Sequence, residues 1–333
     1  MNITYNVNDK IKVLSFLCTV MVLFRHSRNL VAFWGTEHVN NLTAYIENFV
    51  SVLTEVAVPT FFIISGYFFF KYDYYENNNY ILMIKKKYKT LVIPFVFWNI
   101  MGALALLSYD PESIEINIQS AFYNLLLSKW NGPLWYVRDL ILIMFLVPFY
   151  AWIYKVNNII IYLVLFTILY IRWWPIDISL LSSEGLFFFF VGSLIRKNKS
   201  ILEYRLPFIF FLLLLSIWLF YSLNLFPFYD KNTHRINTII GIIVFWRLVD
   251  YIKGRCLVLL YNISAYSFFI YVMHTYLIKM IKRIIAYFCY ENNAIALLTY
   301  IFVPVITIII VFFIAKFWKK YFYQSYLIVS GGR

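Results

Sequence analysis

Three ionisable side chains, Arg25, His26 and Arg28, lie within an apolar segment near the N-terminus. Such groups cost roughly 3 kcal/mol each at the centre of a membrane helix, so they usually mark a functional site. Histidine titrates near neutral pH and suits general-base chemistry, and arginine can stabilise an oxyanion. The competing interpretation is that both arginines snorkel to the headgroups while His26 is a packed core residue.

Further ionisable groups fall at a similar predicted depth. A helical rise of about 1.5 Å per residue converts sequence position to depth. On this scale four groups lie about 8–10 Å below the outer membrane surface, in the same outer half as His26: Glu55, Arg138, Asp139 and Glu184. His274 lies about 10–16 Å deep, depending on whether Lys282 and Arg283, which follow it, snorkel. Charges that meet inside a helix bundle share a depth, whereas lipid-facing charges are scattered. We therefore expect a polar layer inside the bundle.

The composition indicates which class of protein must position these groups. The chain is 62% hydrophobic and 14% charged, with a mean hydropathy of +0.73, whereas soluble domains average about 45–50% apolar and about 25% charged residues. This predicts a polytopic integral membrane protein. The net charge of +13 then reflects basic cytoplasmic loops rather than binding to nucleic acid.

Apolar stretches long enough to span a bilayer predict an all-α bundle of about ten transmembrane helices. Most lysines and arginines outside these stretches fall in the connections on the side of the N-terminus, which predicts that both termini are cytoplasmic. We expect one transmembrane domain over residues 1–333, with no appended soluble domain. The expected spans are 11–31, 48–70, 91–108, 133–154, 158–174, 179–195, 205–223, 236–252, 261–285 and 294–316.

Four segments carry a resemblance to a known family. They are 14–27 (LSFLCTVMVLFRHS), 58–67 (VPTFFIISGY), 132–140 (GPLWYVRDL) and 267–274 (SFFIYVMH). In their order and content the chain resembles the membrane-bound acyltransferase 3 family, whose members O-acylate glycans and other acceptors at bacterial envelopes. One departure is Ser15, which stands where many relatives have an arginine.

The resemblance implies a donor, an acceptor and a location. Members move an acyl group, usually acetyl, from cytoplasmic acyl-CoA to a hydroxyl, here expected on a surface glycan or its lipid-linked precursor. The location implied is the bacterial inner membrane or plasma membrane. The cluster Lys85, Lys86, Lys87 and Lys89 is the candidate for the phosphates of coenzyme A, although such clusters also bind anionic lipid. We expect no metal.

The resemblance also assigns roles at the reacting centre. It implies His26 as the general base or a transient acyl carrier. We expect Glu55 and Asp139 to orient a catalytic histidine, the alternative being that both carboxylates pair with arginines in a structural network. The remaining candidates for substrate binding are Arg25, Arg28, Trp135, Arg138, Glu184 and His274.

Two other classes of protein remain open at this point. A transporter or flippase also builds polar layers at a shared depth. A membrane sensing domain would bind its ligand without chemistry. Ser65 is not expected to be a nucleophile, because the flanking glycines of a G-x-S-x-G elbow are absent, and Ser65-Gly66 fits close helix packing better.

Overall fold

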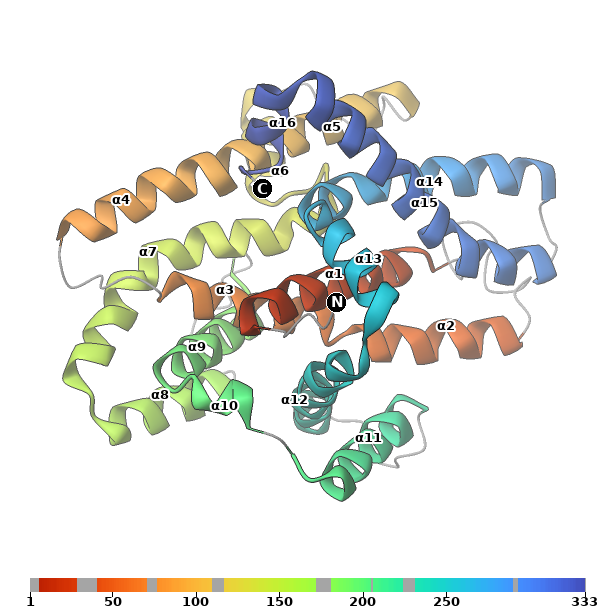
Figure 1. Cartoon of the computed structure of the whole chain (residues 1–333). Helices are drawn as coiled ribbons and strands as arrows, with labels where there is room; N and C mark the ends of the chain where they lie inside the picture. The colour runs from red at the N-terminus through yellow and green to blue at the C-terminus, as the bar shows by residue number, and fades with distance from the viewer. Residues whose placement is uncertain are drawn as a thin grey trace. The chain divides into compact units, whose positions relative to one another are not determined.

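The computed structural model describes residues 6–28, 41–70, 77–109, 117–171, 181–204, 206–223, 231–289 and 293–332. Over these ranges the chain is helical and contains no strand (Figure 1). It divides into two compact units, one formed by 1–60 and 203–317 and the other by 61–202 and 318–333. The expectation of an all-α fold is therefore confirmed for the described residues.

The first unit contains the helix that carries His26. Its helices are α1 (Val7–His26), α2 (Asn41–Thr54), α11 (Phe208–Ser222), α12 (Lys231–Leu248), η4 (Val249–Tyr251), α13 (Gly254–Ser264), α14 (Ser267–Cys289) and most of α15 (Asn293–Tyr321). Within this unit α1 packs against α2, α13 and α14, and α11 packs against α12 and α2 (Figure 1).

The second unit contains the basic cluster and the carboxylate Asp139. Its helices are most of α3 (Ala57–Phe69), α4 (Asn77–Lys87), η1 (Tyr88–Val92), α5 (Ile93–Tyr109), α6 (Ile118–Leu126), η3 (Gly132–Leu134), α7 (Trp135–Val156), α8 (Ile159–Ile171), α9 (Ser183–Lys197), most of α10 (Ser200–Glu203) and α16 (Tyr323–Val329). Here α9 packs against α7 and α8, and α16 packs against α5.

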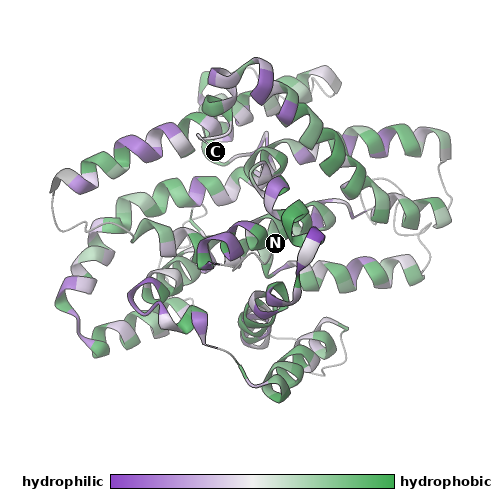
Figure 2. Cartoon of the chain, viewed as in Figure 1, coloured by the Kyte–Doolittle hydropathy of each residue, from purple (hydrophilic) through white to green (hydrophobic). Residues whose placement is uncertain are grey.

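Among the described residues, four helical stretches are long and apolar enough to cross a membrane: Leu42–Phe69, Asn79–Ser108, Gly132–Val156 and Ala294–Tyr321. The pair α13 and α14 makes a fifth if its 77° bend lies within one span. Hydrophobic residues dominate helices such as α11 and α15 (Figure 2). The molecule is thus an α-helical membrane protein. The expected number of about ten spans is larger than the four or five that these helices provide.

Two interruptions place polar groups at helix junctions. Glu55 and Val56 form a turn between α2 and α3, and Ala265 and Tyr266 separate α13 from α14. Around the first turn, the hydroxyls of Thr54 and Thr60 donate to backbone oxygens within their own segments at 2.9 and 2.6 Å. Such bonding of hydroxyls to the helix backbone is a recognised cause of bending.

Candidate active site

The end of α1 brings two histidine rings together in the first unit. The ring centroids of His26 and His274 lie 5.3 Å apart, with the planes inclined by 50°. The side chain of His274 is fully buried, whereas His26 is exposed. His26 is therefore the more accessible residue of the pair.

The hydrogen bonds of His274 assign its tautomer. Its Nδ1 lies 2.5 Å from the backbone oxygen of Tyr271, and its Nε2 lies 3.3 Å from the hydroxyl of Thr275. Because a carbonyl oxygen only accepts, the neutral ring carries its proton on Nδ1 and accepts from Thr275 at Nε2. These bonds fix the orientation of the His274 ring beside His26.

Two cationic side chains act on the exposed histidine. Arg25 and Lys279 both interact electrostatically with the His26 ring. Arg25 is held by Glu55, since its Nη1 lies 3.0 Å from Oε1 of that carboxylate and donates to the backbone oxygen of Ser51 at 3.0 Å. The guanidinium is thus fixed beside His26, where it is suited to stabilising an oxyanion.

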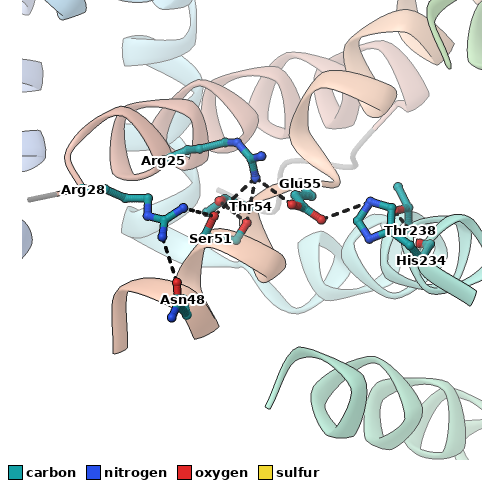
Figure 3. Close-up of polar contacts among 8 residues, drawn as sticks. All are labelled: Arg25, Arg28, Asn48, Ser51, Thr54, Glu55, His234 and Thr238. Atoms are coloured by element: carbon teal, nitrogen blue, oxygen red, sulfur yellow. Dashed lines mark hydrogen bonds and ion pairs between the residues drawn. The ribbon is translucent and has the colours of Figure 1, made fainter. Parts of the chain in front are cut away.

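Glu55 links three elements of this unit (Figure 3). One oxygen meets Arg25 of α1, and the other lies 3.2 Å from Nε2 of His234 in α12. Its contacts among the described residues of the first unit are therefore with Arg25 and His234 rather than with His26. The sequence left two roles open for Glu55: to orient a catalytic histidine, or to pair with an arginine in a structural network. The observed contacts fit the pairing with an arginine better.

Arg28 extends the same network along α2. Its Nη2 donates to Oδ1 of Asn48 at 2.8 Å, and its Nη1 lies 3.5 Å from the hydroxyl of Ser51 (Figure 3). Arg25 also lies 3.5 Å from that hydroxyl. Both arginines thus turn toward α2, where uncharged oxygen atoms satisfy part of their hydrogen-bonding capacity.

The second unit holds a separate ion pair, between the half-buried Arg138 and the buried Asp139. Arg138 donates through Nε and Nη2 to Oδ1 of Asp139 at 3.1 and 2.9 Å, and the carboxylate is fully buried. Oδ2 of Asp139 accepts from the backbone N–H of Ser182 at 2.9 Å. The negative charge therefore lies beside the N-terminus of α9, where it is favourable.

Two further expected residues lie on the two helices that this contact joins, α7 and α9. Glu184 is half-buried in the first turn of α9. The ring of Trp135, at the start of α7, lies 6.2 Å from that of Phe62. The structure places Arg138, Asp139, Trp135 and Glu184 in the second unit, and His26, Arg25, Arg28, Glu55 and His274 in the first.

The basic cluster lies at the end of α4 and in η1. Lys85, Lys86 and Lys89 are exposed. Lys87 is half-buried, with its ammonium 4.1 Å from the ring centroid of Phe69. Three of the four lysines are therefore available to an anionic ligand. In the described part of the chain, no three His, Cys, Asp or Glu side chains are placed to hold a metal ion.

Sequence reasoning did not identify His234 or Glu47 as site residues. His234 lies just before the expected span that begins at 236, so a depth estimate leaves it at the surface. Glu47 likewise precedes the expected span that begins at 48, yet its side chain is fully buried and acts electrostatically on Lys282. Both residues lie within one helical turn before an expected span, so extending each span by a turn at its start includes them.

A comparison with protein-family models decides the class. The model described as an acyltransferase domain, of the acyltransferase 3 family, matches residues 8–316. The chain belongs to the acyltransferase 3 family. This acyltransferase 3 protein is therefore a membrane acyltransferase, as the resemblance of its four segments predicts. No curated protein and no solved structure matches the chain significantly.

Proposed function

We propose that this acyltransferase moves an acetyl group from cytoplasmic acyl-CoA to a hydroxyl of a surface glycan or its lipid-linked precursor. The observation that carries the proposal is the pairing of His26, an exposed residue, with the buried His274, whose ring centroids lie 5.3 Å apart. Family membership supplies the type of reaction. The proposed setting is a bacterial inner or plasma membrane, crossed by about ten helices with both termini cytoplasmic.

In the proposed reaction His26 is the general base. It removes the proton of the acceptor hydroxyl as the hydroxyl oxygen attacks the thioester carbonyl carbon. The carbon–sulfur bond then breaks, and the proton passes from His26 to the leaving thiolate of coenzyme A. In an alternative order a nitrogen of neutral His26 attacks the thioester carbonyl carbon and the carbon–sulfur bond breaks, and the leaving thiolate of coenzyme A takes the proton lost from the other ring nitrogen. The acceptor hydroxyl then attacks the acyl-imidazole, the carbon–nitrogen bond breaks, and the hydroxyl proton passes to the ring.

The surrounding groups have proposed supporting roles. Arg25, held by Glu55, stabilises the tetrahedral oxyanion, and Arg28 binds the acceptor. His274 fixes the His26 ring through packing. In the second unit the proposed role of Asp139 is to hold Arg138 and the start of α9, so that Arg138, Trp135 and Glu184 keep their places for the substrate.

The donor is proposed to bind through the exposed lysines of α4 and η1. Coenzyme A carries several phosphate charges, and lysine binds phosphate as a point charge. Lys85, Lys86 and Lys89 present three such charges within little more than one helical turn. Lys87, stacked on Phe69, contributes its positive charge from a more fixed position.

The test compares the parent with His26→Ala in a host whose surface glycans are defined. Ester-linked acetyl on those glycans is measured by mass spectrometry at equal membrane levels of the two proteins. We expect acetyl with the parent and none with the variant. Equal acetylation by both would refute His26 as the base, and no acetyl with either would refute the acetyl group or the glycan acceptor of this proposal.

A further inference from the structure

Lys282 of α14 is buried against the end of α1. Its side chain is 1% exposed. Its ammonium donates to the backbone oxygen of Ser27 at 2.5 Å and to that of Arg28 at 2.8 Å. These two residues directly follow His26, which ends α1. Lys282 therefore contacts the backbone just beyond the proposed base, and does not turn its charge toward the headgroups as a snorkelling lysine does.

The chemistry at this contact is that of a helix C-terminal cap. The last carbonyls of a helix lack partners within the helix and carry the negative end of its dipole. In a membrane they cannot rely on water, so each unsatisfied group is costly. An ammonium offers three donors, and the buried Glu47 adds an electrostatic attraction on Lys282. The ammonium of Lys282 thus supplies hydrogen-bond donors to the carbonyls at the end of α1, and these carbonyls supply acceptors to the buried ammonium.

The same face of α14 also supplies His274. His274, Ile278 and Lys282 follow at intervals of four residues, and all three are buried. Side chains with this spacing lie along one helix face, and His274 and Lys282 are about 12 Å apart along the axis. One face of α14 thus contacts α1 at two levels, at the His26 ring and at the backbone beyond it.

We propose that Lys282 is a positioning residue that fixes the last turn of α1 and thereby holds His26 against His274. It acts through the carbonyls of Ser27 and Arg28 and touches neither donor nor acceptor. Its effect on catalysis rests on the proposed function of His26, whereas its effect on the end of α1 does not. The two effects can therefore be measured separately.

The first measurement is amide hydrogen exchange over the last turn of α1, with the full-length protein in lipid nanodiscs. The variants are Lys282→Met, which removes the donors, and Lys282→Arg, which keeps charge and donors. Arg283→Met, at the next and exposed position, is the matched control. We expect exchange to accelerate at least about tenfold in Lys282→Met, since hydrogen bonds from charged groups are being lost. Lys282→Arg should restore most of the protection.

The second measurement is transfer kinetics with the same variants. Lys282→Met should lower kcat at least about tenfold while KM for acyl-CoA stays within about twofold, because a misplaced base slows the chemical step alone. Lys282→Arg should recover most of kcat, and Arg283→Met should match the parent. Equal loss in Lys282→Met and Arg283→Met would overturn the catalytic half of the proposal.

Unchanged exchange at the end of α1 in a folded Lys282→Met would overturn the positioning half. If that variant does not fold, Lys282→Gln replaces it and is compared with Lys282→Arg in the same way. If the parent shows no transfer, the function proposed for His26 fails, yet the exchange measurement still decides whether Lys282 holds α1.

Discussion

At Glu55 a single carboxylate connects three parts of one unit: the end of α1, the turn between α2 and α3, and α12. The Arg25 side chain is 42% exposed and that of Glu55 is 22% exposed. An ion pair this open to solvent adds at most about 1 kcal/mol to stability. Its main consequence is therefore geometric, because it sets where the guanidinium lies relative to His26.

Replacing Glu55 by Gln should separate activity from stability. We expect the thermal unfolding midpoint to change little, because the ion pair contributes at most about 1 kcal/mol. The rate of transfer should fall at least about tenfold, because Arg25 loses the anion that fixes it. Glu203→Gln, at an exposed carboxylate of α10, is the control. Full activity in a stable Glu55→Gln protein would remove Arg25 positioning as the role of this carboxylate.

Asp139 should behave in the opposite way. Its carboxylate is fully buried and bonded to Arg138 and to the backbone of Ser182. Asp139→Asn should therefore destabilise the protein by about 3 kcal/mol, because it leaves Arg138, whose side chain is only 13% exposed, without its counter-ion. Chemical denaturation in mild detergent measures this loss. A variant as stable as the parent would show that the pair contributes little to the second unit.

Sequence could predict the position of a residue where its depth along a span was sufficient to find its partner. His26 falls in the predicted polar layer, and His274 joins it if its span ends before Lys282; the structure brings their rings together. Lys282 escaped the same reasoning, because depth alone cannot tell a side chain that snorkels from one that turns inward to another helix. Its partners are the backbone carbonyls of the two residues just beyond α1, which no sequence pattern marks.

At the level of elements, two glycines set the distance between α3 and α9. A Cβ on Gly66 would lie 2.1 Å from the backbone oxygen of Phe189, and one on Gly192 would lie 2.0 Å from that of Ile63. The two helices therefore meet backbone to backbone, at a separation that side chains forbid. The motif containing Ser65 and Gly66 thus serves close packing, and the Ser65 hydroxyl lies 2.9 Å from that of Tyr136.

Alanine at either glycine should force these helices apart. We expect Gly66→Ala and Gly192→Ala each to destabilise the protein by about 1–3 kcal/mol, since the added methyl group meets backbone rather than a flexible side chain. Gly132→Ala is the matched control, because a Cβ there meets nothing within 4 Å. Thermal unfolding of the three variants measures the difference. Equal midpoints would refute the close approach.

The lysines of α4 and η1 should act on the donor alone. Lys85→Gln, Lys86→Gln and Lys89→Gln combined should raise KM for acyl-CoA at least about tenfold, because the three charges proposed to bind its phosphates are lost. The control combines Lys253→Gln, Lys316→Gln and Lys320→Gln, which removes the same charge at other exposed positions. A similar rise in both proteins would indicate a general charge effect rather than a phosphate site.

For the whole molecule, composition was sufficient to predict the class, and four short segments were sufficient to predict the family, which the match over residues 8–316 confirms. The number of spans was less accessible. Hydropathy treats 261–285 as one straight span, whereas the chain breaks before Ser267 and bends by 77°. The bend follows from how the helices pack, which an average over a window of residues does not record.

The predicted orientation in the membrane can be tested with one native thiol and one introduced thiol. Cys256 is exposed in α13, and it falls in a connection predicted to face the cytoplasm. Lys129 is also exposed, in the predicted outer connection 109–132. In intact cells a membrane-impermeant maleimide should leave Cys256 unlabelled, because the bilayer separates reagent and thiol. It should label Lys129→Cys in a Cys256→Ser background, where Cys18 is buried. Permeabilised cells should show labelling of both thiols, and the Cys256→Ser protein without the introduced thiol gives the background from Cys289.

Labelling of Cys256 in intact cells would reverse the predicted side of α13. The basic cluster is predicted to lie on the same, cytoplasmic side as Cys256. Labelling of Cys256 would therefore also exclude cytoplasmic acyl-CoA as the donor that reaches Lys85, Lys86 and Lys89.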